Sequence, residues 1–217
     1  MELREAWTSV VAAADLDRHM ADNGQAAANA GLLDRLLTAM ELPAGAQVLM
    51  PGAGTGQFLD YTSFGSRRLA WVFTDLNPTF LTLLRDRLRR HPALDAAIRA
   101  DDAERPTVPG PFEAVVAVLL LEHIDWQGAI AAWTRLAPRW IALIIQRNEA
   151  EAMLLTARRV LTPTMARFRE VARPHLIPEA ALTAELARRG YPSHWRMEQP
   201  VPDDKTMIAL LYRAEGR

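Results

Sequence analysis

The stretch Gln47-Val48-Leu49-Met50-Pro51-Gly52-Ala53-Gly54-Thr55-Gly56-Gln57-Phe58-Leu59 decides the fold. A short apolar run ends in a glycine-rich turn, and a segment with helical character follows it. This order predicts a strand that delivers a backbone loop to a nucleotide-like ligand. The loop amides and the start of a helix near Thr55 are expected to face that ligand. The pattern G-x-G-x-G is a weak signal by itself, so the residues that follow decide its meaning.

Length, charge and cysteine content limit the classes of function. The chain has 217 residues, a net charge of −1 and no cysteine. Its length suits one domain with a full core, and its charge argues against a nucleic-acid partner. The lack of cysteine excludes disulfides, thiolate nucleophiles and cysteine-based zinc sites. No apolar run approaches the ~18 residues of a membrane span, and no signal-peptide layout opens the chain. We expect a cytoplasmic protein without nucleic-acid or membrane partners, either a monomer or a homodimer.

Apolar segments alternate with turn signals along the chain. The runs Phe112–Leu121 and Trp140–Ile145 are typical of central parallel strands that are covered on both faces. The last two expected strands lack a long helix between them, so they should form a hairpin at one sheet edge. The sequence predicts an α/β fold: a Rossmann-like, doubly wound, seven-stranded, mostly parallel sheet with a reversed edge hairpin and helices on both faces. The expected strands are residues 47–50, 69–74, 97–103, 112–121, 140–145, 195–198 and 207–212.

Acidic residues follow the second and third expected strands. Asp75 lies 19 positions after Gly56, and Asp101 and Asp102 end the next strand. In a doubly wound sheet these strand ends are neighbours at the ligand crevice. A carboxylate at Asp75 can accept two hydrogen bonds from a ribose diol, and one at the third strand can accept from an exocyclic amine. The three successive strand ends therefore predict a site for a nucleoside-containing ligand.

These motifs together resemble the class I S-adenosylmethionine-dependent methyltransferases. The resemblance is close over residues 45–145, and the final helix and hairpin also match that family. A nicotinamide-dependent dehydrogenase fits less well, because its G-x-G-x-x-G pattern wants glycine where Gln57 stands. The residues that carry the resemblance are Gly52-Ala53-Gly54-Thr55-Gly56, Asp75, Asp102-Ala103, Phe112-Glu113 and Leu121-Glu122-His123-Ile124.

The resemblance implies a cofactor, S-adenosyl-L-methionine, and a set of contacts to it. In this family the glycine loop passes beside the methionine part, the acid after the second strand holds the ribose hydroxyls, and the acid after the third contacts adenine. Asp102 takes the adenine role by position, with Asp101 as an alternative. The cofactor contacts implied are Gly52, Ala53, Gly54, Thr55, Gly56, Asp75, Leu76, Asp101, Asp102, Ala103 and Leu120.

One position departs from the family pattern. The first strand of these enzymes usually carries an acid two places before the first glycine, and here that place is Met50. The acid commonly helps to orient the loop and the amino end of the cofactor. Two functions therefore remain: a methyltransferase that acts on O, N or C of a small molecule, with secondary metabolism as one setting, or a methyltransferase-like binding protein without catalysis.

Catalytic candidates lie directly after the fourth expected strand. His123 has an ordinary pKa near operating pH and is a candidate general base, and Glu122 is a second catalytic candidate. Trp126 and Tyr61 are candidate substrate contacts, although Trp126 could equally be core. No metal site is predicted, because acids after the fourth and fifth strands are poorly spaced for one.

The division of the single expected domain, residues 1–217, follows from the same resemblance. Apolar residues outside the shared core suggest a lid over a small-molecule methyl acceptor; they are Trp7, Met20, Met153, Leu154, Met165 and Phe168. The expected parts are an N-terminal helical cap (1–41), a cofactor-binding core (42–146), a substrate lid (147–177), and a last helix with the edge strands (178–217).

Overall fold

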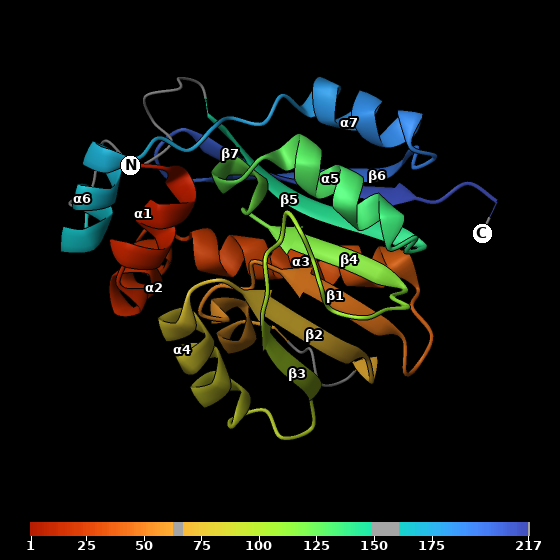
Figure 1. Ribbon diagram of the computed structural model, residues 1–217, viewed down its shortest axis with the longest axis horizontal. Helices are drawn as coiled ribbons and strands as arrows, with labels where there is room; N and C mark the ends of the chain where they lie inside the picture. Colours follow the sequence, from red (N-terminus) through yellow and green to blue (C-terminus); the bar gives the residue numbers. More distant parts are fainter. Residues whose placement is uncertain (63–66, 149–160, 217) are drawn as a thin grey trace.

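The computed structural model describes residues 1–62, 67–148 and 161–216. The strands of its sheet are β1 (Gln47–Pro51), β2 (Ala70–Asp75), β3 (Asp95–Ala100), β4 (Ala114–Val118), β5 (Trp140–Asn148), β6 (Ser193–Val201) and β7 (Lys205–Arg213). They form one seven-stranded sheet in the order β3-β2-β1-β4-β5-β7-β6 (Figure 1). The strands β1 to β5 pair with one another in parallel, and β7 is antiparallel to both β5 and β6. The predicted fold is confirmed.

The hairpin strands are longer than predicted. β6 and β7 have nine residues each, and a turn containing Asp203 and Asp204 at positive φ connects them. The prediction for the first of these strands stopped at Glu198 because polar residues and Pro200 follow. Since β6 is the edge strand, one side of its backbone has no partner strand, and proline is tolerated there.

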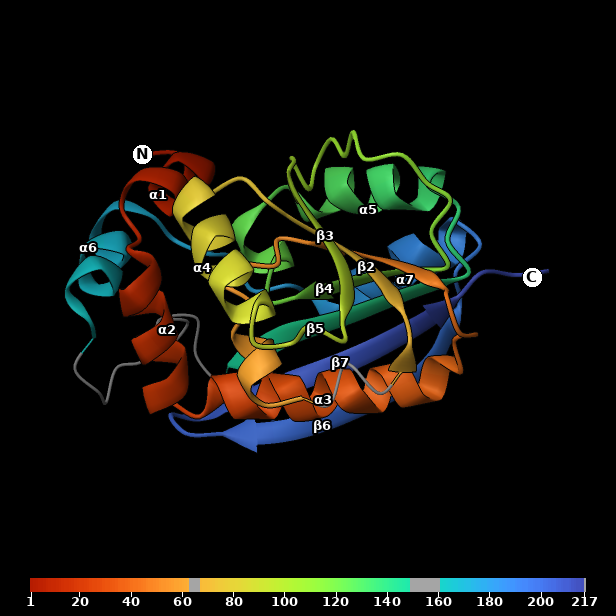
Figure 2. The same ribbon diagram turned by 90° about the horizontal axis from the view of Figure 1, so that it is seen from below.

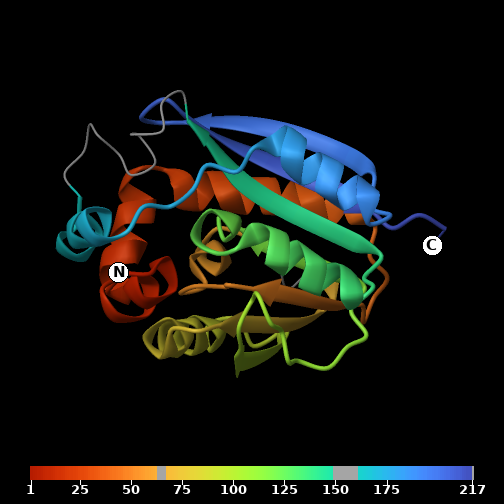
Figure 3. The same ribbon diagram turned by 45° about the horizontal axis from the view of Figure 1, so that its top comes forward.

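Helices cover both faces of the sheet, as predicted. The helices α3 (Gln25–Met40) and α4 (Pro78–Leu88) pack on one face, and α5 (Trp126–Arg135) and α7 (Glu179–Arg188) pack on the other (Figure 3). Successive side chains of β1 point to opposite faces of the sheet. Met50 therefore lies in the core between the sheet and α3, and Leu49 in the core between the sheet and α5. Each is about 1% exposed, so the strand that leads into the glycine loop is fixed from both sides.

The α-helix predicted to start near Thr55 is absent from the described residues. The chain forms instead one short 3-10 helix, η1 (Gln57–Asp60), which contacts α3. Gly56 precedes η1 with φ of 74°, and a Cβ atom at this residue would lie 2.4 Å from Leu84 Cδ1. The loop backbone therefore lies directly against α4, in a left-handed conformation that no regular helix can include.

Three helices gather beside the glycine loop. They are α1 (Leu3–Ser9), α2 (Ala13–Asp22) and α6 (Pro163–Val171), which lie together at one end of the molecule in Figures 1 and 2. An apolar cluster that includes Ala6, Met165 and Phe168 joins α1 and α6 to Phe80 of α4. The helices predicted within residues 1–41 are thus present, with the break at Asn23 and Gly24.

Part of the predicted substrate lid, residues 149–160, lies outside the described residues, and with it Met153 and Leu154. Among the described helices, none combines the length and apolar character that crossing a membrane requires.

Candidate functional site

The glycine loop exposes its backbone to a pocket at the end of β1. At Gly54 φ is 59°, and a Cβ atom placed on this residue would meet no heavy atom within 4 Å. The side of Gly54 on which a Cβ would stand is therefore open among the described residues. Such an opening is what close approach of a ligand to the main chain requires.

Asp75, at the end of β2, is bonded to this loop. Its Oδ2 accepts a hydrogen bond from the Gly54 amide at 2.9 Å, and its Oδ1 accepts one from the Asn77 amide at 2.8 Å. Burial raises the pKa of Asp75, and the amides of Asn77 and Gly54 oppose that rise. The carboxylate thus has a fixed orientation beside the open backbone of the loop.

The outer side of the loop is anchored by α2 and α4. The hydroxyl of Thr55 donates to Asp17 of α2. Arg87 of α4 donates to Asp17, to the Thr55 carbonyl at 2.7 Å and to Asp60 at 2.9 Å. An acid from α2 therefore helps to hold the glycine loop, whereas β1 itself contributes the apolar Met50 before the loop.

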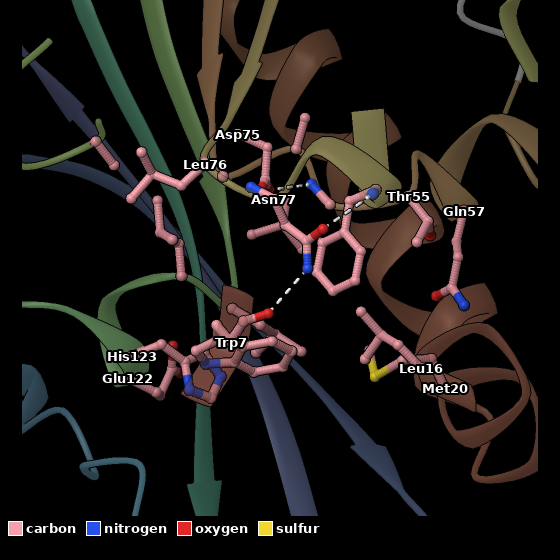
Figure 4. Close-up of a pocket in the computed structure, with 18 of the residues that line it drawn as sticks. Trp7, Leu16, Met20, Thr55, Gln57, Asp75, Leu76, Asn77, Glu122 and His123 are labelled. Carbon is pink, nitrogen blue, oxygen red and sulfur yellow. Dashed lines mark hydrogen bonds between the residues drawn. The ribbon is translucent and has the colours of Figure 1, made fainter. Parts of the chain in front are cut away.

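The pocket lies between the glycine loop, α1, α2 and the ends of β2 and β4 (Figure 4). Its volume is about 230 Å³. Most of the predicted site residues line it, from all three strand ends. They are Gly52, Ala53, Gly54, Thr55, Gly56, Asp75, Leu76, Asp101, Asp102, Ala103, Leu120, Glu122 and His123.

The two acids after β3 have different environments. Asp101 is 8% exposed and accepts from the amide of Thr107 (2.9 Å), its hydroxyl (2.8 Å) and the Val108 amide (3.2 Å). Asp102 forms an ion pair with Arg4 of α1 at 2.8 Å. Asp101 is thus engaged only in holding the loop after β3, whereas Asp102 accepts from the Glu104 amide of that loop at 2.9 Å and also reaches Arg4, with its side chain 20% exposed. Asp102 is therefore the better candidate for a ligand contact.

Glu122 lies in the short 3-10 helix η3 (Leu121–His123), and its side chain is 2% exposed. Oε1 accepts from the Gln146 amide at 2.7 Å, and Oε2 has no hydrogen-bond partner among the described residues. Burial raises the pKa of Glu122 to about 7, and the bond from the Gln146 amide opposes this rise.

His123, the other predicted catalytic residue, packs against Trp7 of α1 with ring centroids 4.5 Å apart. Its Nδ1 has no partner among the described residues. Burial, with a smaller contribution from His175, lowers the pKa of His123 to about 3. The imidazole is therefore neutral at pH 7 and a weak base.

Neither predicted substrate residue, Trp126 or Tyr61, lines this pocket among the described residues, and their role in substrate binding stays a prediction. Trp126 packs against the core cluster between the sheet, α5 and α7. Tyr61 follows η1 and is 49% exposed. The packing of Trp126 is in keeping with the core alternative.

Several lining residues carry no sequence motif. They come mainly from the N-terminal helices, where spacing shows an apolar face but not its target; they include Arg4, Leu16, His19, Gln25, Asn29 and Gln146. Asn77 also lines the pocket, and its amide oxygen caps α4 by accepting from Thr79 at 2.9 Å. The Asn-Pro pair before that helix was an available signal for this residue.

We predict that Glu122 makes stability depend on pH. Its pKa of about 7 in the folded protein exceeds the ordinary value of 4.5. The unfolded chain therefore releases this proton first, and stability falls as pH rises from about 4.5 to 7. At ~1.4 kcal/mol per pKa unit, the full loss is on the order of 3 kcal/mol. Glu122→Gln cannot ionise, so urea unfolding across this range should show the variant gaining on the wild type by that amount. A difference that stays constant with pH contradicts the assignment.

No family model and no curated protein matches the sequence. Solved structures do match the fold. Magnesium protoporphyrin IX methyltransferase (ChlM) from Synechocystis PCC 6803 with bound SAH matches with a TM-score of 0.66 and 14% identity, over 88% of this chain and 84% of that one. The [4+2]-cyclase SpnF matches with a TM-score of 0.65 and 13% identity, over 85% and 81%.

A third match has a different small-molecule substrate in its name. Geranyl diphosphate C-methyltransferase from Streptomyces coelicolor A3(2), in complex with Mg²⁺, geranyl diphosphate and S-adenosyl-L-homocysteine, has a TM-score of 0.63 and 9% identity, over 88% of this chain and 83% of that one. At such identities the likeness concerns the fold. The chain has the fold of the class I S-adenosylmethionine-dependent methyltransferases.

Proposed function

We propose that this protein binds S-adenosyl-L-methionine and transfers its methyl group to a small molecule. The observation that carries the proposal is the bond between the Gly54 amide and the Asp75 carboxylate at the ends of β1 and β2. It joins an open backbone cradle to a fixed, half-buried acid in a fold whose solved examples include chains with bound SAH. These two groups fit a ribose and the adjoining part of the cofactor.

The remaining cofactor contacts follow from the same arrangement. Leu76 and Leu120 line the pocket near Asp75 and the end of β4, and Asp102 with Ala103 lines it at the end of β3. Asp102 and the Ala103 amide are proposed for the adenine. When bound, S-adenosylmethionine supplies a methyl group that its positively charged sulfur has already activated. The protein's part is to hold the two reactants in line and to exclude water.

A small acceptor is supported by what lies beyond these residues. Leu16 and Met20 of α2, Trp7 of α1 and Met165 of α6 line the same pocket, so the helices that close it are apolar on this side. The chain's net charge of −1 offers no general attraction to nucleic acid. We therefore propose a compact, partly apolar methyl acceptor.

A second function is a methyltransferase-like protein without methyl transfer. One reason for it is the apolar Met50 at the end of β1. Another is the matched SpnF structure, which is named as a [4+2]-cyclase, so proteins of this fold are not all named as methyltransferases. Incubation with methyl-labelled S-adenosylmethionine and cell extract separates the two. Label in a small-molecule product supports the first function; binding of the cofactor without any labelled product supports the second.

We predict that calorimetry detects S-adenosylhomocysteine binding, and that Asp75→Ala weakens it by ~1.5–3 kcal/mol. This is the range for hydrogen bonds to a charged group. Asp86→Ala is the matched control, because Asp86 lies on α4, is paired with Arg89 at the surface and does not line the pocket. Absence of binding at millimolar ligand contradicts the proposed function, and equal affinity of the Asp75 variant removes Asp75 from the site.

We also predict that Gly54→Ala folds but binds S-adenosylhomocysteine at least ~10-fold more weakly. The new Cβ meets no protein atom, so the cost to folding is limited to the left-handed backbone, on the order of 1–2 kcal/mol. Gly45→Ala provides the control, since Gly45 also has positive φ (81°) with nothing within 4 Å of a Cβ and lies outside the pocket. It should lose similar stability in urea unfolding and keep full affinity; equal affinity of both variants overturns the loop assignment.

A further inference from the structure

The pocket is lined by Glu122, a buried residue with one hydrogen-bonded carboxyl oxygen, Oε1. Its other oxygen, Oε2, has no hydrogen-bond partner among the described residues. We propose that Oε2 of Glu122 receives a proton from the methyl acceptor, and that the acceptor is a hydroxyl or an N–H amine on a neutral or cationic molecule. This inference rests on the proposed function and narrows it. A carbon acceptor offers no strong hydrogen-bond donor to this oxygen, and an anionic acceptor meets the wrong charge.

The position of Glu122 is fixed by bonds that do not involve Oε2. The Gln146 amide donates to Oε1, and the Glu122 carbonyl accepts from the His175 amide at 2.8 Å. Backbone and side chain are thus both held, and the residue lines the pocket with 2% exposure. Glu122 is thus a pocket residue of fixed position whose Oε2 is buried and has no partner among the described residues.

The unpartnered oxygen indicates a role beyond structure. Accepting from the Gln146 amide needs one oxygen, which a glutamine side chain would supply equally well. A carboxylate adds a second buried oxygen, and leaving it without a donor costs about 1–3 kcal/mol. A ligand O–H or N–H would remove that cost. The arrangement is therefore suited to a substrate that carries such a donor.

His123 is less suited to take the proton. A base is most effective when its pKa lies near the working pH. Burial lowers the pKa of His123 to about 3 and raises that of Glu122 to about 7. The ring of His123 also packs on Trp7 and lies 6.3 Å from Phe168 between ring centroids. His123 therefore serves as part of the pocket wall. Glu122 is the better proton acceptor.

The charges around the pocket define the class of acceptor. Among the described lining residues, Arg4 carries the permanent positive charge, and it is paired with Asp102 at 2.8 Å and Glu104 at 2.9 Å. Burial lowers the pKa of His19 to about 4, so this lining residue is neutral at pH 7. A phosphate or carboxylate on the acceptor would find no unpaired cation here. A neutral or cationic acceptor meets no such penalty.

The step balances with the groups named. A lone pair of the acceptor oxygen or nitrogen forms the new bond to the methyl carbon. The bond between that carbon and sulfur breaks, and its electron pair stays on sulfur, which becomes the neutral thioether. The acceptor's proton passes to Glu122 Oε2 and is released to solvent when the products leave.

Sinefungin provides the test without a known acceptor. In this analogue a carbon bearing a protonated amine replaces the methylated sulfur, so a cationic N–H donor stands at the site of transfer. Calorimetry should show the wild type binding sinefungin at least ~10-fold more tightly than S-adenosylhomocysteine, as a charge-assisted hydrogen bond requires. Glu122→Gln should remove that preference while its affinity for S-adenosylhomocysteine stays within about threefold.

The control is Asp125→Asn, which removes a carboxylate three positions along the chain. Asp125 is exposed, lies outside the pocket and caps α5 by accepting from the Gly128 amide at 3.2 Å, a bond that asparagine can also make. It should keep the full preference. A preference retained by a folded Glu122→Gln, or absent from the wild type, overturns the inference while the proposed function stands. Failure of the wild type to bind S-adenosylhomocysteine removes the proposed function itself.

Discussion

The hydrogen bond between the Gly54 amide and the Asp75 carboxylate is the constraint on which the site depends. It ties the loop after β1 to the end of β2, and the amide of Ala53 adds a bond to the Thr74 carbonyl at 2.9 Å. Both strands are fixed by the packed layers above and below the sheet. The loop therefore inherits its position from the core, and the acid is oriented before any ligand arrives. Such preorganisation limits the ordering cost of binding.

Four buried polar atoms without partners among the described residues belong to side chains that line the same pocket. The described lining residues include Trp7 with a free Nε1, Asn29 with a free Oδ1, Glu122 with a free Oε2 and His123 with a free Nδ1. Each buried orphan costs about 1–3 kcal/mol, so the folded protein gives up stability here. A ligand with donors and acceptors in matching positions would recover part of that loss. The stability cost and the proposed binding role have one physical origin.

The sequence was most informative where chemistry follows the ends of strands. Gly54, Asp75, Asp102 and Glu122 all line the pocket, because parallel strands bring their carboxyl ends to one edge. The α-helix expected after the loop does not form, since the backbone at Gly56 is left-handed and packed against Leu84. The sequence of the N-terminal helices contains no motif that predicts which of their residues line the pocket.

Tertiary packing explains the misses among the side chains. Arg4, His19 and Asn29 reach the pocket through packing of α1–α3, which residue spacing within one helix cannot reveal. Trp126 packs against the core cluster and Tyr61 is exposed beside the pocket's loop, so their predicted substrate contacts stay predictions. The most direct measurement of the central claim is a crystal structure with S-adenosylhomocysteine. We predict ribose hydroxyls within hydrogen-bonding distance of the Asp75 carboxylate, beside the Gly54 backbone; a ligand bound elsewhere, or a pocket that stays empty at millimolar ligand, would contradict the account.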